Sequence, residues 1–207
     1  MSSKIWTSVL NDCPEVRDGF DRSKPVRFYD TTLRDGEQAV GVVFNPEEKF
    51  EIACALDELG VGRIEAGFPR VSDADSRAVR RILDAGLSAE IWGFSRAVQA
   101  DLDALIELGI TQTLIEISTS DLKMKAYGFD RPGVLKKVAG AVDHAVKNNM
   151  KVLFFAVDST RTDLKFLRQV YDVALKSGAA EIAVVDTIGV CAPESVRSLV
   201  REVRGWI

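Results

Sequence analysis

The segment of this chain richest in reactive side chains is D-T-T-L-R-D-G-E-Q at residues 30–38, where an arginine stands next to an aspartate. A guanidinium can stabilise a developing oxyanion, and a carboxylate can bind a hard divalent cation. We therefore interpret Arg34 as a candidate catalytic and substrate-binding group and Asp35 as a candidate metal ligand. An Arg-Asp-Gly turn is also ordinary loop chemistry, so the residue types alone leave both interpretations open.

The elements that must position these side chains follow a regular pattern, because short apolar runs alternate with longer runs of helical period. The expected strands begin near Val26, Arg63, Ala89, Thr111, Val152 and Glu181. The expected helices span residues 46–59, 73–85, 98–108, 131–149, 163–177 and 193–204. The first of these has a clear start signal, since Asn45 and Glu48 match a capping box around Pro46.

Two of the expected strands, at residues 152–157 and 182–185, are apolar on both faces, which indicates a parallel sheet covered on both sides. Repeated βα units of this kind form either an open sheet or a closed barrel. The units recur about every 31 residues, so eight of them would need roughly 270 residues, as a barrel does. We predict an α/β fold of the TIM (β/α)8 type with about six βα units over residues 26–207, after an N-terminal extension at 1–25.

The composition favours small-molecule chemistry. The chain is 46% hydrophobic, and its net charge of −4 comes from interspersed acidic and basic residues, so no nucleic-acid or anionic-membrane partner is expected. No run of about 18 apolar residues and no secretory signal pattern occurs. Three widely spaced cysteines fit a reduced compartment. We therefore expect a cytoplasmic protein.

Three motifs, each following an expected strand, together resemble the signature of the DRE-TIM metallolyases. They are D-T-T-L-R-D-G-E-Q at 30–38, E-A-G-F-P at 65–69 and D-T-I-G at 186–189. The resemblance is to the α-isopropylmalate, homocitrate and citramalate synthase branch of this HMG-CoA lyase-like family. It implies an acyltransferase of amino-acid biosynthesis that condenses acetyl-CoA, or another acyl-CoA, with a 2-oxo acid. It also implies a divalent metal (Mg, Mn or Zn) and a homodimer in the complete enzyme.

The resemblance also implies roles for individual residues. Asp35 matches the metal ligand, Arg34 the group that polarises the keto oxygen, and Thr187 the group that holds the carboxylate of the keto acid. Gln38 and Glu65 are further substrate-binding candidates. For Gln38 ordinary loop hydrogen bonding is the alternative, and for Glu65 it is a rim carboxylate bonded to neighbouring backbone.

The sequence departs from the family at its metal site. Family members complete that site with an H-x-H pair after their seventh strand, and the 207 residues contain no such pair. The single histidine, His144, falls in the expected 131–149 helix, about 20 Å below the level of Asp35. We expect a helix-surface or partly buried imidazole, and we expect the active site to be incomplete, with the chain stopping two units short of a barrel.

The expected pocket walls differ as well. Leu114, Phe155 and Val157 stand where isopropylmalate synthases have His, Ser and a catalytically important Glu. Leu153 stands where homocitrate synthases have the Arg that recognises 2-oxoglutarate, which argues against that activity. Changes of this kind alter specificity without removing the fold, so the acid used stays open.

Two connections are expected on the catalytic face. Residues 120–130 form a connection longer than usual and are a candidate lid, in which Lys123 and Lys125 either approach an anionic substrate or are solvated. Arg161 either binds substrate or forms an ion pair with Asp163 or Asp158.

Two other functions compete with the synthase. One is a lyase like those that cleave 3-hydroxy-3-methylglutaryl-CoA. The other is an inactive barrel fragment or interaction module, whose exposed sheet edges would favour self-association.

Overall fold

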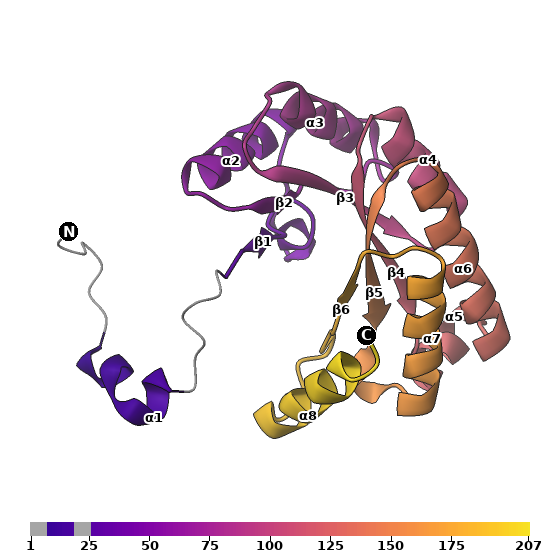
Figure 1. The fold of residues 1–207 in the computed structure, drawn as a ribbon. Coiled ribbons are helices and arrows are strands. Elements are labelled where there is room, and N and C mark those ends of the chain that lie inside the picture. The colour runs from indigo at the N-terminus through magenta and orange to yellow at the C-terminus, as the bar shows by residue number, and fades with distance from the viewer. Residues whose placement is uncertain (1–7, 19–25) are drawn as a thin grey trace.

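The computed structural model describes residues 8–18 and 26–207, and a single curled sheet of parallel strands organises it (Figure 1). Each strand pairs in parallel with the next one along the chain, in the order β1-β2-β3-β4-β5-β6. The strands are β1 Tyr29–Asp30, β2 Arg63–Glu65, β3 Glu90–Arg96, β4 Gln112–Ser118, β5 Lys151–Val157 and β6 Glu181–Ala183. The prediction of an α/β partial barrel with six βα units is confirmed.

Helices connect the strands and cover the outer face of the sheet, as Figure 1 shows. The main ones are α2 Pro46–Glu58, α3 Asp73–Asp84, α4 Gln99–Glu107, α6 Arg131–Lys147, α7 Leu164–Lys176 and α8 Pro193–Arg204. The described part of the N-terminal segment holds a 3-10 turn, η1 Val9–Asp12, and α1 Pro14–Arg17, which lie apart from the sheet in Figure 1. None of the helices described combines the length and the apolar character needed to cross a membrane.

The hydrophobic core lies between the sheet and these helices. Helix α7 contributes five buried side chains to it: Phe166, Leu167, Val170, Tyr171 and Ala174. Strand residues of the outer face, such as Ile115 and Phe154, are fully buried against the helices. Burying a side chain of this size stabilises a fold by about 1.5–3 kcal/mol. The core therefore fixes the strands, and the strand ends fix the site.

The other face of the sheet lines the inside of the curl. Side chains alternate along a strand, so residues paired in register on neighbouring strands face the same side. Arg96, Glu116 and Phe155 form one such row across β3, β4 and β5. Deeper inside, Arg63 of β2 reaches Glu181 of β6.

Two predictions of local structure were wrong. The first strand begins at Tyr29 instead of Val26 and has two residues. The segment expected to be a long loop holds a helix, α5 Asp121–Tyr127, which begins where the Ser120 hydroxyl accepts the Lys123 N–H and ends at Gly128 with a φ of 67°. The N-cap residue Ser120 and the final Gly128 were visible in the sequence, but a seven-residue helix has too few apolar residues to show a helical period. The boundary predicted at residue 26 lies beside residues 19–25, which are outside the described ranges, and stays a prediction.

Candidate active site

The carboxyl ends of the strands open into a cavity of about 510 Å³. In a sheet of parallel βα units these ends meet on one face, which is where such barrels carry their sites. Four of the five candidate residues line this cavity: Arg34, Asp35, Gln38 and Thr187. The fifth, Glu65, lies fully buried next to Arg34. We call this space the mouth cavity.

A tight turn after β1 places Arg34 and Asp35. The carbonyl of Thr31 accepts the N–H groups of Arg34, Asp35 and Gly36 at 2.8–3.1 Å. The Asp30 carboxylate accepts the Thr32 N–H at 2.9 Å, which closes the start of the same turn. The chain then forms the 3-10 turn η2 Gly36–Gln38. Four side chains of the motif thereby line the mouth cavity: Thr31, Arg34, Asp35 and Gln38.

Arg34 is held on two sides. Its Nε donates to the Glu65 carboxylate, and its guanidinium lies over the Phe94 ring, 4.3 Å from the ring centroid. Burial raises the pKa of Glu65, and the neighbouring Arg34 charge offsets only part of that effect. Glu65 therefore bonds Arg34, not the neighbouring backbone considered as its alternative. This contact fixes the direction of the guanidinium before any ligand arrives.

Asp35 can provide one ligand oxygen for a cation. Its side chain is 60% exposed, and one carboxylate oxygen lies 3.2 Å from Nη1 of Arg34. Hard divalent cations bind several oxygen ligands. Within residues 8–18 and 26–207, no three His, Cys, Asp or Glu side chains are grouped to hold a metal ion. The described residues thus fit a metal in part, since Asp35 offers one carboxylate at the mouth cavity, and its role as a metal ligand stays a prediction.

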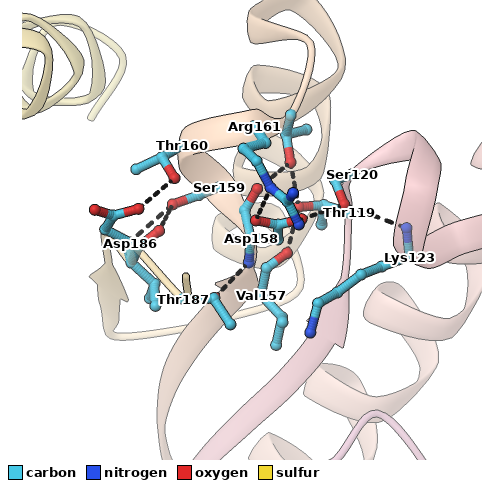
Figure 2. Close-up of polar contacts among 12 residues, drawn as sticks. Thr119, Ser120, Lys123, Val157, Asp158, Ser159, Thr160, Arg161, Asp186 and Thr187 are labelled. Carbon is cyan, nitrogen blue, oxygen red and sulfur yellow. Dashed lines mark hydrogen bonds and ion pairs between the residues drawn. The ribbon is translucent and has the colours of Figure 1, made fainter. Parts of the chain in front are cut away.

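On the opposite wall, Thr187 follows β6 and is fixed by a polar network that Figure 2 draws. Its hydroxyl oxygen accepts the backbone N–H of Asp158 at 2.8 Å. The next turn, η3 Ser159–Arg161, is tied to the same segment, because Ser159 exchanges hydrogen bonds with the backbone of Val185 at 2.7 and 2.9 Å. The segment that carries Thr187 is therefore bound along its length to the end of β5.

Asp186 reinforces this connection. One of its carboxylate oxygens accepts the Thr160 hydroxyl at 2.8 Å (Figure 2). The other accepts the Cys191 N–H at 2.9 Å. These bonds, led by the one from Cys191, hold the pKa of the Asp186 carboxyl below its usual value. Asp186 is thus engaged in the loop and is a weak proton acceptor.

One residue of the mouth cavity was missed in the sequence, Glu116 of β4. It lines both the mouth cavity and a second space of about 290 Å³ between Arg96 and Tyr127. Burial raises the pKa of its carboxyl, and the charges of Arg34 and Lys123 offset only part of that effect. The alternation along 112–118 was the signal that could have found it.

The other sequence-based alternatives have definite outcomes. Lys123 lines the mouth cavity, whereas Lys125 is exposed outside its lining. Arg161 forms an ion pair with Asp158 at 2.7 Å. His144 lies on α6, partly buried, with its Nε2 2.7 Å from the Asp103 carboxylate, which agrees with the expectation of a helix-surface or partly buried imidazole.

A neighbouring cavity of about 390 Å³ adjoins the mouth cavity and shares Arg34 and Gln38 with it. Its other walls are largely apolar and come from the 42–44 loop, Phe68 and Val71. Lys49 lies at its base, 3% exposed, between the carboxylates of Glu37 and Asp75. An elongated ligand reaching Arg34 through this cavity would therefore meet apolar side chains before the charged centre.

Known proteins resemble this chain over most of its length. The HMGL-like family model matches residues 25–207. The homocitrate synthase AksA of Methanopyrus kandleri is 43% identical over 195 residues, which cover 92% of this chain and 49% of that protein. The 2-isopropylmalate synthase of Methanocaldococcus jannaschii is 40% identical over 180 residues, covering 86% of this chain and 35% of that protein.

Among solved structures, the HMG-CoA lyase of Bacillus subtilis superposes with a TM-score of 0.76 at 19% identity, covering 87% of this chain and 64% of the lyase chain. At that identity the likeness concerns the fold, and it agrees with the partial barrel described above. The chain spans about half or less of the length of these two curated relatives.

Proposed function

The chain belongs to the HMGL-like family, and on that premise we propose that its strands form the greater part of a barrel that condenses an acyl-CoA with a 2-oxo acid. The observation that carries the proposal is the pair Arg34 and Asp35, side by side at the mouth with Thr187 across the same cavity. A cation-binding carboxylate, an oxyanion donor and a hydroxyl are the groups that a 2-oxo acid requires.

Each side chain then has a defined task. The hydroxyl of Thr187 donates to the carboxylate of the 2-oxo acid, and Arg34 lies toward its keto oxygen. The α-carbon of the thioester gives a proton to a base that none of the residues assigned here supplies, and it bonds to the keto carbon, whose π electrons move to oxygen; the same proton then neutralises the alkoxide. Arg34 stabilises the resulting alkoxide, and Glu65 keeps the guanidinium in place. Water then hydrolyses the thioester and releases the thiol of coenzyme A.

For the metal, the proposal assigns Asp35 one ligand position. A divalent cation bound there would make the keto carbon more electrophilic. The remaining ligands have to come from the substrate, from water or from residues outside the described set, since these hold no group of three.

The acyl-CoA is assigned to the neighbouring cavity. It is apolar, it adjoins the mouth cavity, and the shared residues Arg34 and Gln38 lie where the two spaces meet. Gln38 is therefore a candidate contact for the thioester. The 2-oxo acid is assigned to the mouth cavity, where Phe155 and Val157 form an apolar wall beside Glu116. This lining favours an acid with an uncharged side chain.

The lyase alternative is weaker. The synthases resemble this chain at about 40% identity, whereas the lyase likeness rests on a shared fold at 19% identity. An inactive fragment remains the second candidate, because the described residues supply one metal carboxylate and the sheet has six strands. A cytoplasmic location and a homodimer of the complete enzyme belong to the proposal as well.

The test restores eight strands. Residues 1–207 are joined to the part of the M. kandleri homocitrate synthase that follows its matched region. The chimera is incubated with acetyl-CoA, Mg²⁺ or Mn²⁺ and one acid from a panel of pyruvate, 2-oxoisovalerate and 2-oxoglutarate. We expect release of free thiol that depends on the acid.

Variants separate the site from the rest of the fold. Arg34→Lys and Asp35→Asn should each lower the rate by about a hundredfold or more, while Arg197→Lys, on the outer helix α8, should not change it. A folded chimera that releases no thiol with any acid overturns the synthase proposal. Cleavage of 3-hydroxy-3-methylglutaryl-CoA by that chimera would replace it with the lyase.

A further inference from the structure

Asp158 occupies an unusual position for an aspartate. It ends β5 with a φ of 66° and a ψ of 34°, in the left-handed region that residues other than glycine seldom adopt. Its side chain is fully buried, although it lies next to the mouth cavity and does not line it. A strained backbone and a buried charge at one residue persist only where neighbouring contacts determine them.

Those contacts are all present. Arg161 donates Nε and Nη2 to the two carboxylate oxygens at 2.8 and 2.7 Å, and the Ser120 hydroxyl donates to the same group at 2.5 Å. Burial would raise the pKa of the Asp158 carboxyl, but the bonds from Arg161 and Ser120 outweigh it and hold the pKa below its usual value. The carboxylate therefore stays charged and keeps both partners.

The backbone of Asp158 is fixed from the other side. Its carbonyl accepts the Thr162 hydroxyl at 2.9 Å, and Thr162 is 2.8 Å from the Thr119 hydroxyl. The side chain and the backbone carbonyl of Asp158 are thus both held. Its N–H then donates to the Thr187 hydroxyl oxygen at 2.8 Å (Figure 2). Because that oxygen accepts this bond, the Thr187 hydroxyl keeps its own proton for donation to a ligand.

The Asp158 carboxylate is also connected, through Ser120, to the start of α5. Ser120, which donates to Asp158, also accepts the Lys123 N–H at the start of α5. Lys123 lines the mouth cavity together with Thr187 (Figure 2). One buried carboxylate thus connects the segment after β6, which carries Thr187, with the start of α5, which carries Lys123.

We propose that Asp158 is a positioning residue: its buried contacts with Arg161 and Ser120 hold Thr187 and the start of α5 so that the Thr187 hydroxyl donates to the carboxylate of a 2-oxo acid. This inference rests on the proposed function for the identity of the ligand. The positioning itself is a property of this chain and is measured separately.

The test compares Asp158→Gly, Asp158→Asn, Thr187→Val and their combinations in the 207-residue chain. Asp158→Gly is compatible with the left-handed backbone and removes the carboxylate alone. The matched control is Asp163→Asn, since Asp163 lies five residues away and caps α7. The first readout is the Thr187 side-chain rotamer from three-bond NMR couplings, with hydrogen exchange of the Asp158 amide. The second is the affinity for pyruvate by NMR titration.

We expect one fixed Thr187 rotamer in the parent chain and in Asp163→Asn, and rotamer averaging with a faster-exchanging amide at residue 158 in Asp158→Gly. Pyruvate affinity should fall about tenfold in Asp158→Gly and in Thr187→Val, with no further fall in the double variant. A fixed Thr187 rotamer in a folded Asp158→Gly chain overturns the proposal, as do losses that multiply in the double variant. If neither the parent chain nor the eight-stranded chimera binds pyruvate, the assigned ligand is wrong, while the rotamer measurement still decides the positioning.

Discussion

Arg63 of β2 and Glu181 of β6 form a two-pronged ion pair across the inside of the curled sheet, with Nη1 and Nη2 2.7 and 2.9 Å from the carboxylate oxygens. The two residues are 118 positions apart in sequence, and β2 and β6 are not neighbours in the sheet. Glu181 also accepts Lys151 of β5 at 2.7 Å. The pair therefore holds the first and last parts of the sheet at a fixed separation.

Breaking this pair should weaken the fold. Glu181→Gln and Arg63→Met should each lower the free energy of unfolding by about 1–2 kcal/mol, because both side chains are partly exposed and the attraction is screened. A double-mutant cycle in urea measures the coupling. The control is Glu47→Gln, whose pair with Arg81 is about half exposed on both sides, and which should change stability by less than about 0.5 kcal/mol. Additive losses in the cycle would mean that the two residues do not act together.

The same pair predicts a pH dependence. Hydrogen bonds from Arg63, followed by that from Lys151, lower the pKa of Glu181 to about 2 from an ordinary value of 4.5. Since the folded state has the lower pKa, the stabilisation is complete above about pH 5.5 and is lost as the pH falls toward 2. Melting temperatures of the parent chain and Glu181→Gln should differ at pH 7 and converge near pH 2. A constant difference would contradict the assignment.

Glu116 should have the opposite effect. Burial raises the pKa of its carboxyl, so the folded state favours the protonated form and loses stability as the pH rises through that pKa. Glu116→Gln should therefore raise the melting temperature at pH 8 and leave it unchanged at pH 3. Glu107→Gln, on the exposed end of α4, is the control. A destabilised Glu116→Gln chain at pH 8 would show that the carboxylate has a partner.

Glu116 should also influence which acids enter the mouth cavity. At a pH where the Glu116 carboxyl is ionised, its charge in the cavity wall repels the second carboxylate of 2-oxoglutarate, which pyruvate lacks. In the eight-stranded chimera, Glu116→Gln should raise the ratio of kcat/KM for 2-oxoglutarate to that for pyruvate by about tenfold. An unchanged ratio would place the distal end of the acid away from β4.

Helix α5 depends on its final glycine. Gly128 has a φ of 67°, and an alanine there would be strained, although no atom lies within 4 Å of its added methyl group. Gly128→Ala should lower the free energy of unfolding by about 1 kcal/mol. Gly140, inside α6 and equally free of close neighbours, should respond oppositely, with Gly140→Ala raising it by about 0.5–1 kcal/mol. Equal responses would mean that α5 does not end there.

The sequence predicted the units and the motif well because both depend on local signals. The capping box at Asn45 and the glycine after the helix at 163–177 are visible in a few residues, and the structure has both features. Arg34 and Thr187 each follow a strand, and the carboxyl ends of parallel strands meet on one face, so their placement at one cavity could be predicted. The roles assigned to these residues stay predictions.

What could not be predicted depends on contacts between distant residues. The bond from Asp158 to Thr187 spans 29 positions, and the contact from Arg34 to Glu65 spans 31. In neither contact does the local sequence around one residue indicate which residue it will bind. Glu116 could have been found from the alternation of β4, but the raised pKa of its carboxyl depends on burial and on charges from other elements, such as Arg34 and Lys123.

Lys49 has a consequence for ligand entry. The Lys49 side chain is 3% exposed, and its ammonium group joins Glu37 of the turn η2 to Asp75 of α3 at 2.5 Å each. The turn that carries Gln38 is thereby attached to the next βα unit and cannot swing away as a free loop. A ligand that binds beside the turn η2 does not have to immobilise it. Less of the binding free energy is then spent on ordering the protein, so the affinity is higher.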